Sequence, residues 1–191
     1  MNYNNAPNSK DIEMELTRER HKLRYWKTFR STVFVLIVAA ALAVLVAMLW
    51  LPVLQIYGVS MTPTLQEGEI VLSLKDSNMK QGDIVAFYYG NKLLVKRCIA
   101  GPGSWVDIKE DGTVQVDGKI LEEPYVSEKA LGSCDLEFPY QVPEDKYFLM
   151  GDHRATSVDS RHSSVGCVSE EQIVGKIVFR IWPLSAFGNI D

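Results

Sequence analysis

The sequence carries the apolar run VFVLIVAAALAVLVAMLWL at positions 33–51. A helix over this run would be roughly 28 Å long at about 1.5 Å per residue, close to the roughly 30 Å hydrocarbon core of a bilayer. A cleavable secretory signal is the alternative, but its apolar region is usually about 7–15 residues long and ends in a small-x-small site. Here the run ends Met48-Leu49-Trp50-Leu51-Pro52, which offers no such site. The sequence therefore predicts one retained transmembrane helix over residues 31–52.

The charges that flank this run predict its orientation. Residues 1–30 hold seven basic and four acidic side chains, and no further charge follows Arg30 until Glu67. The positive-inside rule places residues 1–30 in the cytoplasm as a basic tail and residues 53–191 outside the plasma membrane. The tail carries +3, which leaves −7 on the rest of a chain whose total is −4. This asymmetry argues against a nucleic-acid partner and fits a tail lying at an anionic inner leaflet.

The chain beyond residue 52 has the pattern of a mainly β domain. Short β-rich runs recur there, separated by turn signals such as Glu67-Gly68, Pro102-Gly103 and Asp117-Gly118, and only residues 169–173 hint at a helical turn. We expect an antiparallel sheet or barrel-like fold. The predicted strand segments are Ile70–Leu72, Ile84–Tyr89, Leu93–Val95, Val106–Ile108, Val114–Val116, Tyr147–Met150 and Ile177–Phe179.

Three cysteines, Cys98, Cys134 and Cys167, lie in the segment placed outside the cytoplasm. An odd count allows at most one disulfide, and Cys134 with Cys167 is the preferred pair because Cys98 lies within an apolar strand pattern. Alternatively, all three are free and buried. No pair has C-x-x-C spacing, which argues against a zinc or redox site.

Ser60 is a candidate nucleophile because of its place in the chain. It lies nine residues beyond the apolar run, and nine extended residues reach about 30 Å. Ser60 is therefore expected close to the outer membrane surface. A serine is a poor nucleophile unless a neighbouring base takes its proton, and the alternative for Ser60 alone is a turn residue before Thr62-Pro63.

Lys96 is the candidate base, within the apolar segment Leu93-Leu94-Val95-Lys96-Arg97-Cys98-Ile99. Burial of an ammonium group lowers its pKa toward the range in which lysine is neutral, as a general base at neutral pH requires. The alternative is an outward-facing strand lysine. The adjacent Arg97 indicates that one of the two side chains points to solvent.

A third cluster follows the predicted strand Tyr147–Met150. Two acidic and two basic side chains fall within ten positions there, which suggests interlocked ion pairs that fix a loop and leave Ser157 free to orient a base; a solvated charged loop is the alternative. A Ser-His-Asp arrangement with His153 or His162 is disfavoured, because both histidines lie on this polar loop. The four charged residues are Asp152, Arg154, Asp159 and Arg161.

Together, three segments resemble the nucleophile, lysine and Gly-Asp-Asn-Arg boxes of bacterial type I signal peptidases, in the order of that family and behind its N-terminal anchor. The resemblance covers roughly residues 31–183, except a poorly matched middle at about 108–143. Residues of about 105–145 are expected to form a variable, insertion-like subdomain. The segments are Ser60-Met61-Thr62-Pro63-Thr64-Leu65, Val95-Lys96-Arg97-Cys98-Ile99-Ala100-Gly101-Pro102-Gly103, and Gly151-Asp152-His153-Arg154 through Ser157-Val158-Asp159-Ser160-Arg161.

The resemblance implies a Ser-Lys dyad. Ser60 would attack the scissile carbonyl, Lys96 would take its proton, and water would hydrolyse the acyl-enzyme. Ser157 would hydrogen-bond the lysine, the four charged residues would hold their loop, and the Ser60 backbone N–H would be an oxyanion donor. No metal or cofactor is implied. The residues that match the shallow apolar substrate pockets of the family are Ile56, Met61, Leu65, Leu94 and Val95.

The implied substrates are exported pre-proteins that carry signal peptides, bound as an added β-strand and cut after small-x-small sequences. The implied enzyme is a monomer in the lipid bilayer. This chain departs from the family pattern at four positions. Gly58 stands where some members have a serine that helps the oxyanion hole, His153 replaces an asparagine, Cys98 an aliphatic residue and Ser104 a common aspartate.

Three alternatives remain beside this interpretation. Dedicated maturation of a single substrate would use the same chemistry, and the sequence does not exclude it. A self-cleaving regulator would be cytosolic and carry a DNA-binding domain, against which the anchor counts. A non-enzymatic tethered β-domain would require all three segments to be purely structural.

Overall fold

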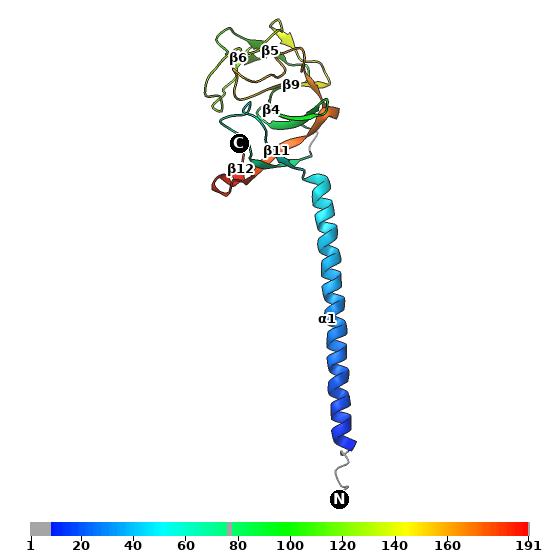
Figure 1. Ribbon diagram of the computed structural model, residues 1–191. Helices are drawn as coiled ribbons and strands as arrows, with labels where there is room; N and C mark the ends of the chain where they lie inside the picture. Colours follow the sequence, from blue (N-terminus) through cyan, green and yellow to red (C-terminus); the bar gives the residue numbers. More distant parts are fainter. Residues whose placement is uncertain (1–8, 76–77, 191) are drawn as a thin grey trace, which may run out of the picture. The chain divides into compact units, whose positions relative to one another are not determined.

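The computed structural model describes residues 9–75 and 78–190 and divides the chain into two units with a boundary between Leu49 and Trp50 (Figure 1). Residues 1–8 of the predicted basic tail lie outside the described residues. The predicted division into tail, transmembrane segment, outer domain and subdomain stays a prediction.

The described part of the first unit is the helix α1 (Ser9–Trp50), apart from its last residue, Trp50. No glycine or proline interrupts this segment, so no residue with a strong penalty for the helical backbone occurs within it, and Pro52 follows its end, where proline is expected. All of its described side chains are exposed. By length and composition, α1 is the one described helix that could cross a membrane.

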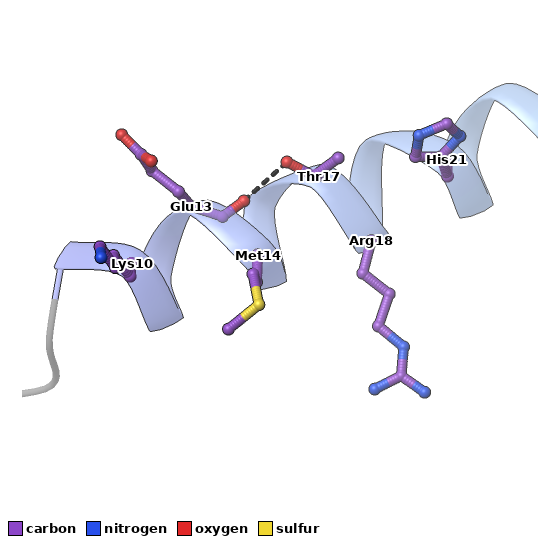
Figure 2. A pocket seen from close by; sticks show the side chains of 6 residues that line it. All are labelled: Lys10, Glu13, Met14, Thr17, Arg18 and His21. Atoms are coloured by element: carbon purple, nitrogen blue, oxygen red, sulfur yellow. Dashed lines mark hydrogen bonds between the residues drawn. The ribbon is translucent and has the colours of Figure 1, made fainter.

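A shallow hollow lies on the charged N-terminal part of α1 (Figure 2). The side chains that line it come from this one helix, and Thr17 donates its hydroxyl hydrogen to the Glu13 carbonyl oxygen over 2.7 Å. That bond belongs to the ordinary i, i−4 pattern of a helical threonine. The hollow therefore gives no indication of a binding site. Its lining residues are Lys10, Glu13, Met14, Thr17, Arg18 and His21.

The second unit consists of antiparallel β-sheets, which confirms the predicted fold class. A larger sheet has the strand order β1-β2-β11-β3-β4-β9-β10, with β12 beside β11, and a smaller one the order β7-β6-β5-β8. Neither sheet closes on itself within the described residues, so the unit is not a closed barrel. The larger sheet comprises β1 (Val53–Gln55), β2 (Ile70–Leu74), β3 (Ile84–Tyr89), β4 (Lys92–Ala100), β9 (Lys146–Met150), β10 (Val168–Ser169), β11 (Ile173–Trp182) and β12 (Gly188–Asn189). The smaller comprises β5 (Trp105–Ile108), β6 (Val114–Val116), β7 (Lys119–Ile120) and β8 (Tyr140–Gln141).

Each predicted strand segment lies within an observed strand, and the predicted helical turn is the 3-10 helix η1 (Glu170–Gln172). A second 3-10 helix, η2 (Leu184–Ala186), follows β11. The strands that the pattern did not reveal (β1, β7, β8, β10 and β12) are two or three residues long, too short for an alternation of apolar and polar residues to be recognised. The β3–β4 hairpin turns through Gly90-Asn91, and Gly90 has φ +57, as the first residue of a two-residue hairpin loop requires.

Apolar packing in this unit fixes the segments that carry the candidate site. One cluster buries Ile56, Met61 and Leu65, which bracket Ser60, against β2, β3 and β11. A second packs Ile99 and Phe148 of the larger sheet against the smaller sheet. The loop between β1 and β2 is therefore held to the sheet on both sides of Ser60.

Candidate active site

The structure brings the two candidate catalytic residues together. Ser60 is half-buried on the loop between β1 and β2, and Lys96 lies on β4, where it pairs with Val85 of β3. Lys96 Nζ is 2.6 Å from Ser60 Oγ, which is hydrogen-bond distance. A hydroxyl and an amine in this contact can exchange a proton without further movement.

Lys96 has the environment of a base rather than of a cation. Its side chain is on an apolar strand, and the residue is only 3% exposed. Burial lowers the pKa of Lys96 to about 8, although the carboxylates of Asp159 and Asp152 favour the charged form. At pH 7 about one-tenth of the lysine is therefore neutral and able to accept a proton.

Arg97 differs from the expectation that one of the two adjacent basic residues faces solvent. Arg97 is 2% exposed, so both faces of β4 are covered at this point. Its Nε and Nη2 donate to the two carboxylate oxygens of Asp152 over 2.9 and 2.8 Å, and Nη1 donates to the Gly82 carbonyl oxygen over 2.8 Å. A guanidinium with all of these partners is stable in a buried position. The expectation of a solvent-facing side chain was wrong.

The charged loop after β9 is ordered by buried ion pairs, but two of its members pair outside the loop. Asp159 and Arg161 pair with each other over 2.8 Å, both fully buried. Asp152 pairs with Arg97 of β4, and Arg154 pairs with Glu123 from the irregular segment after β7.

Asp159 also accepts the Gly151 backbone N–H over 2.9 Å. Burial alone would raise the pKa of Asp159. The hydrogen bond that Arg161 donates to this carboxylate, together with the positive charge of Arg161, outweighs burial and keeps the pKa low. Asp159 is therefore a fixed carboxylate that holds the start of the loop.

Ser157 lies in the same buried loop and is 1% exposed. Its hydroxyl is close enough to Asp159 to favour the carboxylate, yet within the described part of the chain Ser157 Oγ has no partner in hydrogen-bond geometry. The expected hydrogen bond from Ser157 to Lys96 is therefore not formed in this structure.

The histidine side chains have other partners. His153 Nδ1 is 3.0 Å from Thr156 Oγ1, and His162 Nδ1 is 3.6 Å from Asp135 Oδ2. The His153 backbone N–H, however, donates to the Ser60 carbonyl oxygen over 3.1 Å. At this position it is therefore the main chain that contacts Ser60, the candidate nucleophile.

A groove of about 530 Å³ opens beside Ser60. Of the residues predicted to bind substrate, Ile56, Met61, Leu94 and Val95 line it. Leu65 is not among the lining residues, because it is fully buried in the cluster beneath the loop. The remaining lining residues are Val53, Leu54, Gln55, Tyr57, Gly58, Ser60, Lys92 and Leu93.

The edges of this groove are backbone segments without a second strand partner among the described residues. β1 pairs only with β2, and β4 pairs with β9 only from Arg97 onward. Gly58, one of the lining residues, has φ +80 and open space where a side chain would stand. Apart from its two chain neighbours, no atom of the described residues lies within 4 Å of the position that a Cβ atom of residue 58 would take.

The three cysteines are free. The preferred disulfide between Cys134 and Cys167 was wrong. Cys134 Sγ lies 3.7 Å from the Leu136 carbonyl oxygen, and Cys167 Sγ lies 4.0 Å from Tyr140 Oη. Cys98 is fully buried, and burial raises the pKa of its thiol to about 12. In the described ranges, no group of three or more His, Cys, Asp or Glu side chains is placed to hold a metal ion.

Several residues of the site escaped the sequence analysis. Thr64 donates its hydroxyl hydrogen to Asp152 Oδ2 over 2.5 Å, and Arg180 Nη2 donates to the Thr64 carbonyl oxygen over 2.5 Å. Arg180 Nε also lies 2.9 Å from the buried Glu69 carboxylate, although not in hydrogen-bond geometry. Lys96 was singled out because it is a charged residue within an apolar strand. The same criterion would also have singled out Arg180.

Comparisons with known proteins agree with this geometry. The family model described as "Signal peptidase, peptidase S26" matches residues 29–182. Signal peptidase I of Bacillus licheniformis is 36% identical over 94% of this chain and 99% of its own length. Signal peptidase IB of Staphylococcus aureus is 37% identical over 69% of this chain and 78% of its own.

A crystal structure of a signal peptidase I from Enterococcus faecalis covers 52% of this chain and 96% of its own chain at 28% identity, with a TM-score of 0.42, below the level at which a shared fold can be argued. The match of the family model and the identity over nearly the whole chain confirm the predicted family. The chain belongs to the signal peptidases of family S26, which are serine endopeptidases.

Proposed function

We propose that this signal peptidase cuts its substrates with Ser60 as nucleophile and Lys96 as general base. The 2.6 Å contact between Ser60 Oγ and a buried Lys96 is the observation that carries the proposal. A protonated lysine could not take the serine proton, so the lowered pKa supports the same assignment.

The reaction follows from this contact. Ser60 Oγ attacks the scissile carbonyl carbon while its proton passes to neutral Lys96 Nζ. The C–N bond then breaks, the leaving amine takes the proton from Lys96, and an ester with Ser60 remains. Lys96 next takes a proton from water, and the resulting hydroxide attacks the ester carbonyl. The bond between the carbonyl carbon and Ser60 Oγ breaks, the proton passes from Lys96 to Ser60 Oγ, and the new carboxyl end is released. The Ser60 backbone N–H would stabilise the oxyanion in both steps.

The groove is the proposed binding site for the segment before the cut. An extended peptide between β1 and Lys92–Val95 would complete the hydrogen bonds of both edges, as in β-strand addition. Alternate side chains of an extended peptide point to the same face. Shallow apolar contacts from Ile56, Met61, Leu94 and Val95 would therefore favour small residues at alternate positions, as in a small-x-small sequence.

The proposed setting is a plasma membrane crossed once by α1, with the basic N-terminal part inside and residues beyond 52 outside. Ser60 would then act at the outer surface on pre-proteins whose signal peptides lie in the same bilayer. A monomer with no nucleic-acid partner is proposed, since one chain contributes both groups of the dyad.

The test of the dyad is cleavage of a model pre-protein in detergent by the wild-type chain and single variants. We expect Ser60→Ala and Lys96→Ala to be inactive. His153→Ala should remain active, because its contact with Ser60 is made by the backbone N–H. A fully active Lys96→Ala chain would refute the dyad.

The test of orientation is protease added outside spheroplasts. We expect digestion beyond residue 52 and protection of an epitope tag attached before residue 9. Protection of the catalytic unit would reverse the proposed orientation.

A further inference from the structure

The connection between β7 and β8 runs from residue 121 to 139 without regular secondary structure. Irregular connections of this length within a compact unit are uncommon and often functional. Part of it, residues 123–135, is here called the strap and falls within the predicted subdomain. The strap contacts the active-site residues at several points.

Its first contact is a buried ion pair. Arg154 Nη1 donates to Glu123 Oε2 over 3.1 Å, its Nη2 to Glu123 Oε1, and both side chains are fully buried. Arg154 Nε donates to the Gly151 carbonyl oxygen over 3.1 Å. The guanidinium is thus held by the active-site loop on one side and by the strap on the other.

The second contact is made by an aromatic ring. Arg97 Cζ lies 3.9 Å from the centre of the Tyr125 ring, the geometry of a cation–π interaction. The ring covers the guanidinium that forms two hydrogen bonds with Asp152. Water is thereby kept from the Arg97–Asp152 pair, which strengthens it.

The third contact is made by strap backbone. Arg161 Nη1 donates to the carbonyl oxygens of Ala130 and Leu131 over 3.3 and 2.7 Å. Gly132 approaches so closely that a Cβ atom there would lie 2.3 Å from the Arg154 carbonyl oxygen. Three arginines are buried in the described structure: Arg97, Arg154 and Arg161. Each therefore has partners on the loop after β9 and further partners in the strap.

These arginines adjoin both halves of the dyad. Arg97 follows Lys96 on β4, and Arg154 follows His153, whose N–H holds the Ser60 carbonyl. We propose that Glu123 and Tyr125 are positioning residues that maintain the spacing of Ser60 and Lys96. This inference rests on the proposed Ser-Lys mechanism. Because no strap residue lines the groove, it predicts an effect on turnover rather than on substrate binding.

The test measures kcat and KM for cleavage of a model pre-protein by the full chain in detergent. Tyr125→Leu removes the ring, Tyr125→Phe keeps it, and Glu123→Gln removes the charge. Matched controls are Tyr140→Leu, whose ring packs on Phe148 of β9 instead, and Glu122→Gln, an exposed neighbour. Circular dichroism and thermal unfolding establish that each variant is folded.

We expect Tyr125→Leu and Glu123→Gln to lower kcat between about 10- and 100-fold, the range for small misplacements of reacting groups, with KM changed less than about twofold. Tyr125→Phe and both controls should keep the wild-type kcat. Tyr125→Leu creates no unpaired charge, so it remains informative if Glu123→Gln fails to fold.

A folded Tyr125→Leu chain with wild-type kcat would overturn the proposal. Equal losses in Tyr125→Leu and Tyr140→Leu would also overturn it, since the effect would then come from general loosening of the subdomain. Failure of the Ser-Lys mechanism has a different signature, namely activity in Lys96→Ala measured in the same assay.

Discussion

The Thr64 hydroxyl and the Asp152 carboxylate are joined by a 2.5 Å hydrogen bond. Asp152 also accepts two hydrogen bonds from Arg97, the neighbour of Lys96 on β4. Thr64 belongs to the loop that carries Ser60, so a short chain of polar contacts links the loop of the proposed nucleophile to β4, which carries the proposed base. Loss of a contact among Thr64, Asp152 and Arg97 would alter the distance between Ser60 Oγ and Lys96 Nζ, on which the proposed proton transfer depends.

Thr64→Val keeps the shape of the side chain and removes this hydrogen bond. We expect kcat for pre-protein cleavage to fall about tenfold or more, because the loop is no longer tied to Asp152. Thr64→Ser retains the hydroxyl and should restore most of the rate. Thr17→Val, which removes a threonine hydrogen bond on α1, is the control and should have no effect. Equal rates for Thr64→Val and Thr64→Ser would contradict this role.

The pH dependence of cleavage should report the pKa of Lys96. Because only the neutral amine accepts the serine proton, kcat/KM should fall about tenfold per pH unit on the acid side. The midpoint is expected near pH 8, where burial places the lysine. Initial rates between pH 6 and 10 at substrate concentrations below KM measure this limb. A flat profile down to pH 6 would rule out Lys96 as the titrating base.

Burial of Lys96 should also lower the free energy of unfolding of the chain. Its pKa is about 8 in the folded chain against 10.5 for an ordinary lysine. Between these values the unfolded state binds a proton that the folded state does not, so stability rises with pH across this window and the full penalty applies below it. The penalty is at most about 3 kcal/mol.

Lys96→Met removes the charge and retains a long apolar stem. We expect this variant to be inactive yet more stable than wild type at pH 7, and the difference in Tm should shrink as the pH approaches 10. Thermal unfolding of both chains in the same detergent at pH 7 and pH 10 measures the effect. A Lys96→Met chain less stable than wild type at pH 7 would show that Lys96 contributes net stabilising contacts.

The strands, and Ser60 and Lys96 as the residues to consider together, could be predicted because their signals are local. Ile84–Tyr89 is an apolar run bounded by turns, and Lys96 stands out as a charge within an apolar strand. Ser60 gained its assignment from motif order and from its place shortly after the apolar run. Each inference used residues close together in the chain or a motif already associated with the family.

The partners of the buried arginines could not be predicted, because they come from distant parts of the sequence. Arg97 was expected to alternate with Lys96 between buried and exposed faces. Asp152 and Tyr125, from two other segments, cover it instead. Glu123 carries no local sign that it neutralises Arg154, since charge in an irregular segment usually indicates solvent exposure. Such pairings depend on tertiary packing, which residue spacing does not encode.

Gly151, on the loop after β9, packs closely against Ser60, and a larger residue at this position would test how much that close packing matters. A Cβ atom at this position would lie 2.3 Å from Ser157 Oγ and 2.5 Å from the Ser60 carbonyl oxygen. We therefore expect Gly151→Ala to displace Ser60 from Lys96 and lower kcat about 100-fold. Gly101→Ala is the matched control, because nothing lies within 4 Å of its Cβ position and, like Gly151, it has no left-handed φ. Steady-state cleavage by the two folded variants decides the point, since equal activity would mean that Ser60 tolerates a looser contact with this loop than the structure shows.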